Sequence, residues 1–294
     1  MNVTIDMPSV ALVHTRKCPC FYTHFPACME FLNGFTDYGY TVTCAKSLSD
    51  CRGKDILLLS NQAVNIQFLH KLSVINPDAV YILWCYHSLI DQIPFKKFII
   101  TGEYFHYTPR MDSHIYVDAI NKSIPNFVPL MLRADDSPAS IGLYTKTYEL
   151  DGCFMGTPYK PEWVAGLPNI LYHDISHGFF TYDERRAVHL KSKIAFGFTS
   201  DANILNYHPT QRIFEGLAYG CVVLSDNEAA RDLTGGIVEY VSSKEEFLSK
   251  YNYYLSHPEE CKKKQLEGYA WTKQYGTNRY SAALFLNKIK ELGF

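Results

Sequence analysis

Short runs of hydrophobic residues, each bounded by polar or turn residues, recur along the first half of the chain. A stretch with helical spacing of its apolar positions, residues 26–38, lies between the first two runs. The runs are Val10–His14, Thr41–Ala45, Asp55–Ser60, Ala79–Cys85, Lys97–Thr101 and Asn126–Leu132. Continuous hydrophobic runs separated by helices are typical of a parallel sheet that is covered on both faces.

The same alternation returns in the second half, after a polar segment. Residues 133–151, RADDSPASIGLYTKTYELD, contain Pro138 and little periodicity, and they predict a linker between domains. The strands predicted beyond it are Cys153–Gly156, Asn169–Tyr172, Lys193–Phe198, Cys221–Ser225 and Gly236–Val241. The helices predicted there span residues 209–219, 244–255, 258–275 and 278–292. We therefore expect a second α/β domain.

The length agrees with two domains, because 294 residues exceed what a single hydrophobic core usually serves. Two doubly wound, Rossmann-like domains of similar size face each other across a cleft in several enzyme families. Ligands of such sheets bind outside the carboxyl ends of the strands. The loops that follow the predicted strands are therefore where candidate site residues are expected.

Composition and charge exclude several classes of partner. The formal net charge is −2, which does not favour nucleic acid or an anionic membrane surface as a ligand. No hydrophobic run approaches the roughly 20 residues that a membrane span requires. The start of the chain does not read as a signal peptide, so we expect a cytoplasmic protein whose nine cysteines are reduced thiols.

Residues 208–227, HPTQRIFEGLAYGCVVLSDN, predict a short helix, a glycine stop and a buried strand. Pro209 suits the first turn of the helix and Gly220 its end. Arg212 and Glu215 are three positions apart and hence neighbours on one helix face, where an exposed ion pair would contribute little. The buried strands on either side, however, place the helix N-terminus at the strand ends. Its N–H groups and partial positive charge suit a diphosphate.

Residues 209–233, PTQRIFEGLAYGCVVLSDNEAARDL, resemble the donor-binding segment of GT-B glycosyltransferases, in which Arg or Lys and then Glu precede a small–Gly–hydrophobic strand. The likeness extends over residues 150–294 and is closest to the C-terminal domain of glycosyl transferases group 1. The resemblance implies the GT-B fold, with an acceptor-binding domain over residues 1–140 and a nucleotide-sugar-binding domain over residues 150–277. It also implies that a C-terminal helix, residues 278–294, crosses back to the first domain.

The resemblance also implies which residues hold the donor. Glu215 would bind the ribose hydroxyls and Arg212 the diphosphate, and Thr210 and Gln211 are counted with them at the start of the same helix. Gly156 matches the glycine at which a phosphate approaches the backbone. Lys160 either reaches a phosphate or is a solvated loop lysine, and the sequence leaves both open.

The stereochemistry and the catalytic base are inferred from the same likeness. Many retaining members carry a second Glu eight positions before the ribose Glu, where this chain has Tyr207, so inverting transfer is favoured. Inverting transfer needs a general base on the acceptor hydroxyl. His24, shortly before Pro26, matches the family's position for that base, although it could equally be a partly buried loop histidine. His14 and His87, each at the end of a predicted strand, are the alternatives.

We expect neither a metal nor a cofactor beyond the UDP- or GDP-linked sugar. His14, Cys18, Cys20, His24 and Cys28 are dense enough to suggest zinc, but Cys-x-Cys is a poor start for a tetrahedral site. No Asp-x-Asp clamp for a metal–diphosphate complex is present. Two alternatives to a transferase acting on an acceptor hydroxyl stay open. One is a nucleotide-sugar epimerase of the same fold, and the other is a non-catalytic scaffold that binds a sugar or a protein.

Overall fold

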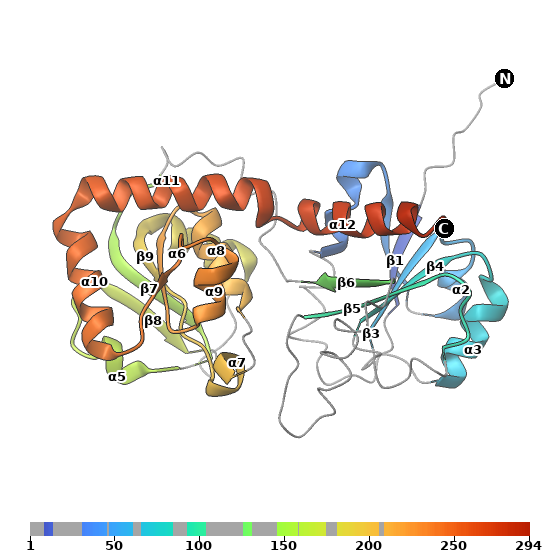
Figure 1. The fold of residues 1–294 in the computed structure, drawn as a ribbon, viewed down its shortest axis with the longest axis horizontal. Helices are drawn as coiled ribbons and strands as arrows, with labels where there is room; N and C mark the ends of the chain where they lie inside the picture. Colours follow the sequence, from blue (N-terminus) through green and yellow to red (C-terminus); the bar gives the residue numbers. More distant parts are fainter. Residues whose placement is uncertain are drawn as a thin grey trace. The chain divides into compact units, whose positions relative to one another are not determined.

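The structure is a computed structural model that describes residues 9–13, 31–45, 47–60, 66–84, 93–103, 126–130, 146–157, 159–174, 181–205 and 209–294. The chain divides into two compact units. Unit 1 comprises Met1–Leu132 together with Asn278–Phe294, and unit 2 comprises Arg133–Thr277. Each unit is built around one parallel sheet (Figure 1).

Unit 1 contains a six-stranded sheet of order β2-β1-β3-β4-β5-β6, in which every neighbouring pair is parallel. Its strands are β1 (Ser9–Val13), β2 (Thr41–Ala45), β3 (Ile56–Ser60), β4 (Val80–Trp84), β5 (Phe98–Glu103) and β6 (Phe127–Leu130). Its described helices are η1 (Thr36–Tyr38), α2 (Leu48–Cys51), α3 (Ile66–Ile75) and α12 (Asn278–Glu291).

The sheet of unit 1 is buried on both faces, which explains its continuous hydrophobic strands. Alternate residues of a strand point to opposite faces. On β3, Leu58 packs on the face that Phe285 of α12 covers, and Leu57 packs on the face that Leu69 of α3 covers. The helix that ends the sequence thus supplies core residues to the unit that begins it (Figure 1).

Unit 2 contains a five-stranded parallel sheet of order β11-β10-β9-β7-β8. Its strands are β7 (Leu150–Gly156), β8 (Ile170–Asp174), β9 (Ser192–Phe196), β10 (Val222–Ser225) and β11 (Glu239–Tyr240). Its helices are α5 (Pro161–Val164), α6 (Tyr182–Lys191), α7 (Asp201–Leu205), α8 (Gln211–Ala218), α9 (Glu228–Leu233), α10 (Lys244–Ser256) and α11 (Pro258–Tyr275). From β7 the chain first adds β8 on one side and later β9 on the other, so the order reverses between β7 and β9.

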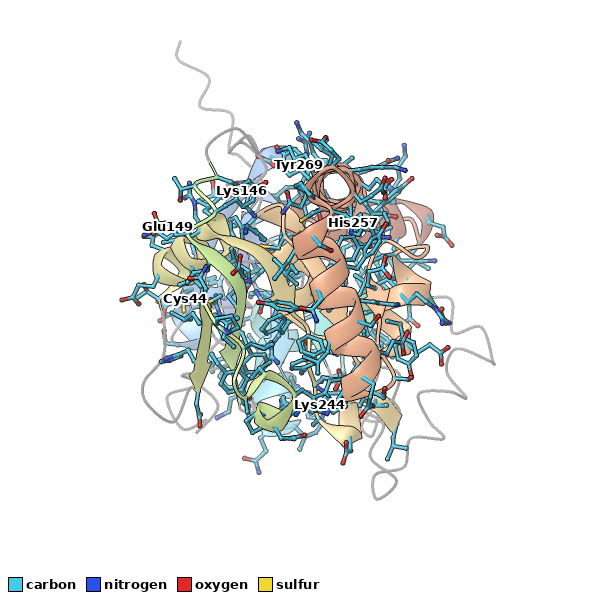
Figure 2. All side chains as sticks on the ribbon, turned by 90° about the vertical axis from the view of Figure 1, so that its left-hand side faces the viewer. Cys44, Lys146, Glu149, Lys244, His257 and Tyr269 are labelled. Carbon is cyan, nitrogen blue, oxygen red and sulfur yellow. The ribbon has the colours of Figure 1, made fainter. Side chains whose placement is uncertain are left out.

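Helices cover both faces of this second sheet. On one face, Phe154 of β7 packs in a cluster with Phe247 of α10, and Lys244 at the start of α10 donates to the Glu162 carbonyl oxygen of α5 over 2.6 Å (Figure 2). On the other face, α8 lies beside α11, where Phe214 stacks on Trp271 at 6.1 Å between ring centroids (Figure 1). Helix α8 is therefore held between the sheet and α11.

The predicted α/β class with two doubly wound parallel sheets is confirmed, whereas several element limits differ. The strand predicted over Gly236–Val241 shrinks to Glu239–Tyr240, because Gly235 and Gly236 adopt positive φ values in a turn. The helix predicted over residues 209–219 begins only at Gln211, since Thr210 is extended at the N-cap. Among the described helices, none combines the length and apolar character that a membrane crossing requires.

Candidate functional site

The candidate site lies at the carboxyl edge of the unit 2 sheet, where the strand order reverses. Such switch points are where open α/β sheets bind ligands. Gly156 ends β7 at this edge, and Phe198 follows β9 by two residues. The Arg212 side chain, from the first turn of α8, is hydrogen-bonded to the Phe198 carbonyl oxygen. The fold thus brings Arg212 to the switch point.

Arg212 is held among aromatic rings. Its guanidinium carbon lies 4.6 Å from the centre of the Phe154 ring and 5.9 Å from that of Tyr159, and its Nη1 donates to the Phe198 carbonyl. Burial lowers the pKa of Arg212, while Tyr159, Glu215 and other nearby groups oppose that shift. Since an arginine stays protonated in proteins, this is a fixed positive charge in a desolvated setting, where it acts strongly on an anion.

Gly156 is required by the position of Arg212. Its φ of 147° is one that residues with a side chain rarely adopt. A Cβ at this position would overlap the Arg212 guanidinium. The predicted close-approach glycine and the predicted diphosphate arginine are therefore in contact in the structure, and their roles toward a donor stay predictions.

Glu215 is buried, at 3% exposure, and its ion pair is not with the cation that the helix spacing indicates. Its Oε1 lies 3.4 Å from Nη2 of Arg185, a residue of α6. The alternative of an exposed ion pair between Arg212 and Glu215 is therefore not what the structure has. Both side chains point inward, and the ion pair of Glu215 is with another helix.

Helix α6 was not predicted from the sequence, although one signal for it is present. Thr181 and Glu184 form a capping box, in which Thr181 Oγ1 accepts from the Glu184 N–H and the Glu184 carboxylate accepts from the Thr181 N–H. The pattern Thr-x-x-Glu is a recognised start of a helix. It would have placed Arg185 on the first turn of a helix.

Lys160 has a partner that neither of its two predicted roles included. Its Nζ lies 2.6 Å from Oδ2 of Asp226, whose side chain is 1% exposed, and 4.5 Å from the centre of the Trp163 ring. Oδ1 of Asp226 accepts from the Thr199 N–H over 3.1 Å. Lys160 is thus not a solvated loop lysine. A phosphate contact would have to compete with Asp226.

The N-terminus and the C-terminus of α8 differ in how their backbone groups are capped. Thr210, at the N-cap, makes no side-chain cap, and its buried Oγ1 makes no hydrogen bond with the described part of the chain. Gln211 is the first residue of the helix. At the other end, Nζ of Lys146 donates to the Tyr219 and Gly220 carbonyls over 2.9 and 2.7 Å, which caps the C-terminus with a cation (Figure 2). The first turn of α8 has no side-chain cap from Thr210, so its N–H groups can bind an anion.

The candidate bases lie outside the described residues. These are His14, His24 and His87, and the same holds for Tyr207 and for the cysteines of the zinc hypothesis, Cys18, Cys20 and Cys28. Within the described ranges, no group of three or more His, Cys, Asp or Glu side chains is arranged to hold a metal ion. The interdomain cleft stays a prediction.

A hollow of about 570 Å³ lies elsewhere, in unit 1. Ile56, Val80 and Lys97 line it, at the amino ends of β3, β4 and β5. Ligands of parallel sheets bind at the opposite edge. We therefore do not place the donor site there.

Comparison with known proteins agrees with this fold. Residues 143–287 match the model of a family described as glycosyl transferase-like. An alpha-glucosyltransferase solved with UDP and a DNA containing an HMU base has a similar fold, with a TM-score of 0.64 at 11% identity, covering 96% of this chain and 99% of that one. T4 phage BGT, solved with its UDP-glucose substrate, gives a TM-score of 0.53 at 10% identity, covering 97% and 98%. No curated protein matches the chain by sequence.

Proposed function

We propose that the chain is a glycosyltransferase that transfers a sugar from a UDP- or GDP-linked donor to an acceptor hydroxyl by an inverting, metal-independent route. The match of residues 143–287 to a glycosyl transferase-like family and the fold that the chain shares with the alpha-glucosyltransferase support this proposal. The observation that carries the proposal is the contact of Arg212 with Gly156 at the switch point of the unit 2 sheet. A fixed cation there, beside a helix N-terminus, suits a diphosphate.

Within this proposal each residue of the site has a role toward the donor. Arg212 and the first turn of α8, with Thr210 and Gln211, bind the diphosphate, which approaches the backbone at Gly156. Glu215 accepts hydrogen bonds from the ribose hydroxyls, because an ionised carboxylate offers only acceptors. Lys160 contacts a phosphate if the donor displaces it from Asp226.

In the transfer step the acceptor oxygen attacks the anomeric carbon as the bond from that carbon to the diphosphate oxygen breaks. The hydroxyl proton passes to an imidazole, for which we propose His24, with His87 and His14 as alternatives. Arg212 and α8 stabilise the charge that develops on the leaving diphosphate. Tyr207, at the position of the second Glu of many retaining members, supports inversion.

Release of nucleoside diphosphate tests the activity. The transferase should release UDP or GDP from a nucleotide sugar only when an acceptor is added. Interconversion of nucleotide sugars without an acceptor would indicate the epimerase, and donor binding without turnover would indicate the scaffold. The anomeric configuration of the product, read by NMR, tests inversion, and a product with the donor's configuration would refute it.

Metal independence and the base are tested in the same assay. Turnover should be unchanged in excess EDTA, and a loss that Mg²⁺ restores would contradict the proposal. His24→Ala should abolish turnover without weakening donor binding. If His24→Ala kept full turnover, the base would be His87 or His14.

A further inference from the structure

We propose that Arg185 is a positioning residue for Glu215, and that the pair makes the donor site select ribonucleotides over deoxyribonucleotides. The inference rests on the ribose role proposed for Glu215. It adds a residue that no feature of α8 itself indicates, since Arg185 lies on α6.

Glu215 is buried beside this arginine, and Arg212 is a second cation in its surroundings. The Glu215 side chain is 4% exposed and the Arg185 side chain 31%, and Oε1 and Nη2 are 3.4 Å apart. A buried carboxylate stays ionised only beside a cation or with hydrogen bonds to its oxygens. Within the described structure, Oε1 is buried and accepts no hydrogen bond, so Arg185 holds it by charge alone.

The contact between Arg185 and Glu215 is long for a hydrogen bond. Hydrogen-bonded pairs of a guanidinium and a carboxylate are typically about 2.7–2.9 Å apart, whereas Oε1 and Nη2 are 3.4 Å apart. Arg185 therefore orients the carboxylate by charge, and the carboxylate gives up no hydrogen bond to it when it turns to a ribose hydroxyl.

Helix α6 is a rigid support for the arginine. Its first turn is fixed by the capping box, with the Thr181 N–H donating to Glu184 Oε2 over 2.7 Å. The Arg185 N–H donates to the Thr181 carbonyl over 3.0 Å. The helix packs against β7, β9 and α8. Arg185 is thus anchored to the same sheet that carries Gly156.

The test measures selectivity for the ribose by calorimetric titration of UDP, 2′-deoxy-UDP and 3′-deoxy-UDP, and of the corresponding GDP series. The wild-type protein should bind the ribonucleotide about tenfold or more tightly than the deoxy forms, as for hydrogen bonds to a charged group. In Arg185→Met that ratio should fall to within about twofold, because the hydrogen bonds from the ribose hydroxyls to Glu215 are lost. A tenfold ratio corresponds to roughly 1.4 kcal/mol of binding free energy. Arg186→Met, which removes the neighbouring positive charge on α6, should keep the wild-type ratio.

The outcomes of this titration distinguish the role of Arg185 from the ribose role of Glu215 on which it rests. A wild-type protein without ribose preference, or a Glu215→Gln variant that keeps it, contradicts the ribose role of Glu215. If Glu215→Gln loses the preference while Arg185→Met keeps it, the role of Arg185 is refuted and that of Glu215 stands. If Arg185→Met does not fold, Arg185→Gln decides by the same ratio. A merely structural arginine would weaken all the nucleotides equally and leave the ratio unchanged.

Discussion

Two buried carboxylates of unit 2, Asp226 after β10 and Glu215 in α8, each pair with a cation, and the two pairs differ in how closely the cation approaches. In the first, Asp226 is 1% exposed and contacts Lys160 at 2.6 Å, while its other oxygen accepts from the Thr199 N–H. In the second, Glu215 is 4% exposed and lies 3.4 Å from Arg185, and its Oε1 accepts no hydrogen bond within the described structure. The first pair is close and the second is loose, and in both the carboxylate oxygen that faces the cation is buried and accepts no other hydrogen bond within the described structure.

The difference separates structural from ligand-binding charge. A close pair stabilises the conformation in which it is found, because removal of the cation would leave a buried, uncompensated carboxylate. The Lys160–Asp226 pair links the loop after β7 to the end of β10 in this way. A loosely paired carboxylate loses less when it turns toward a ligand, which the ribose role proposed for Glu215 requires.

Breaking the close pair of Lys160 and Asp226 should have the largest effect. Lys160→Met leaves Asp226 buried without its cation, and we expect a loss of about 3–5 kcal/mol in the free energy of unfolding. Chemical denaturation measures it. Lys191→Met, which breaks an exposed pair with Glu149, is the matched control and should leave the melting temperature unchanged. Equal losses in the two variants would contradict the distinction.

The loss in Lys160→Met should depend on pH. Burial raises the pKa of Asp226, and Lys160 opposes that shift, so the pKa rises further in the variant. A group whose pKa is higher in the folded state stabilises folding when it is protonated, and this contribution disappears as the pH rises through the folded-state pKa. The variant should therefore be destabilised more at pH 8 than at pH 4. Denaturation at both pH values checks this, and a loss independent of pH would refute the burial argument.

Glu215→Gln should change binding more than stability. The substitution leaves Arg185, whose side chain is 31% exposed and can be hydrated, so the melting temperature should change little. Loss of a charged acceptor should cost the donor about 1.5–3 kcal/mol of binding free energy. Titration with UDP and GDP measures that cost. If instead the variant unfolds, and its folded fraction binds nucleotide as tightly as the wild type, then Glu215 is a structural charge and not a ligand-binding one.

Gly156→Ala should have a smaller effect that combines strain with displacement of Arg212. The positive φ costs roughly 1–3 kcal/mol of stability for a residue with a side chain, and the added methyl overlaps the guanidinium. Gly166→Ala is the control, since Gly166 has a φ of 84° but open space where the alanine Cβ would lie. Both variants should lose stability, and only Gly156→Ala should lose nucleotide affinity. Loss of affinity in both would remove the argument for close contact.

Local patterns in the sequence predict the helix and the strand that position the site. The apolar face of α8, its glycine stop and the buried β10 form a continuous pattern, and it brings Arg212 to the edge of the sheet. The Lys160–Asp226 pair could not be predicted, because its partners are distant in the sequence and no periodicity links them. Helix α6 is not predicted by the hydrophobic pattern, because its sequence, YDERRAVHLK, lacks an apolar stripe. The capping box at its start is the remaining sequence signal for this helix.

The most direct test of the central claim is a crystal structure of the protein with UDP or GDP bound. The account predicts the diphosphate within hydrogen-bond distance of the Arg212 guanidinium and of the first turn of α8, with a ribose hydroxyl on Glu215. A nucleotide bound elsewhere, with Arg212 still directed at the Phe198 carbonyl and Glu215 still contacting only Arg185, would contradict it.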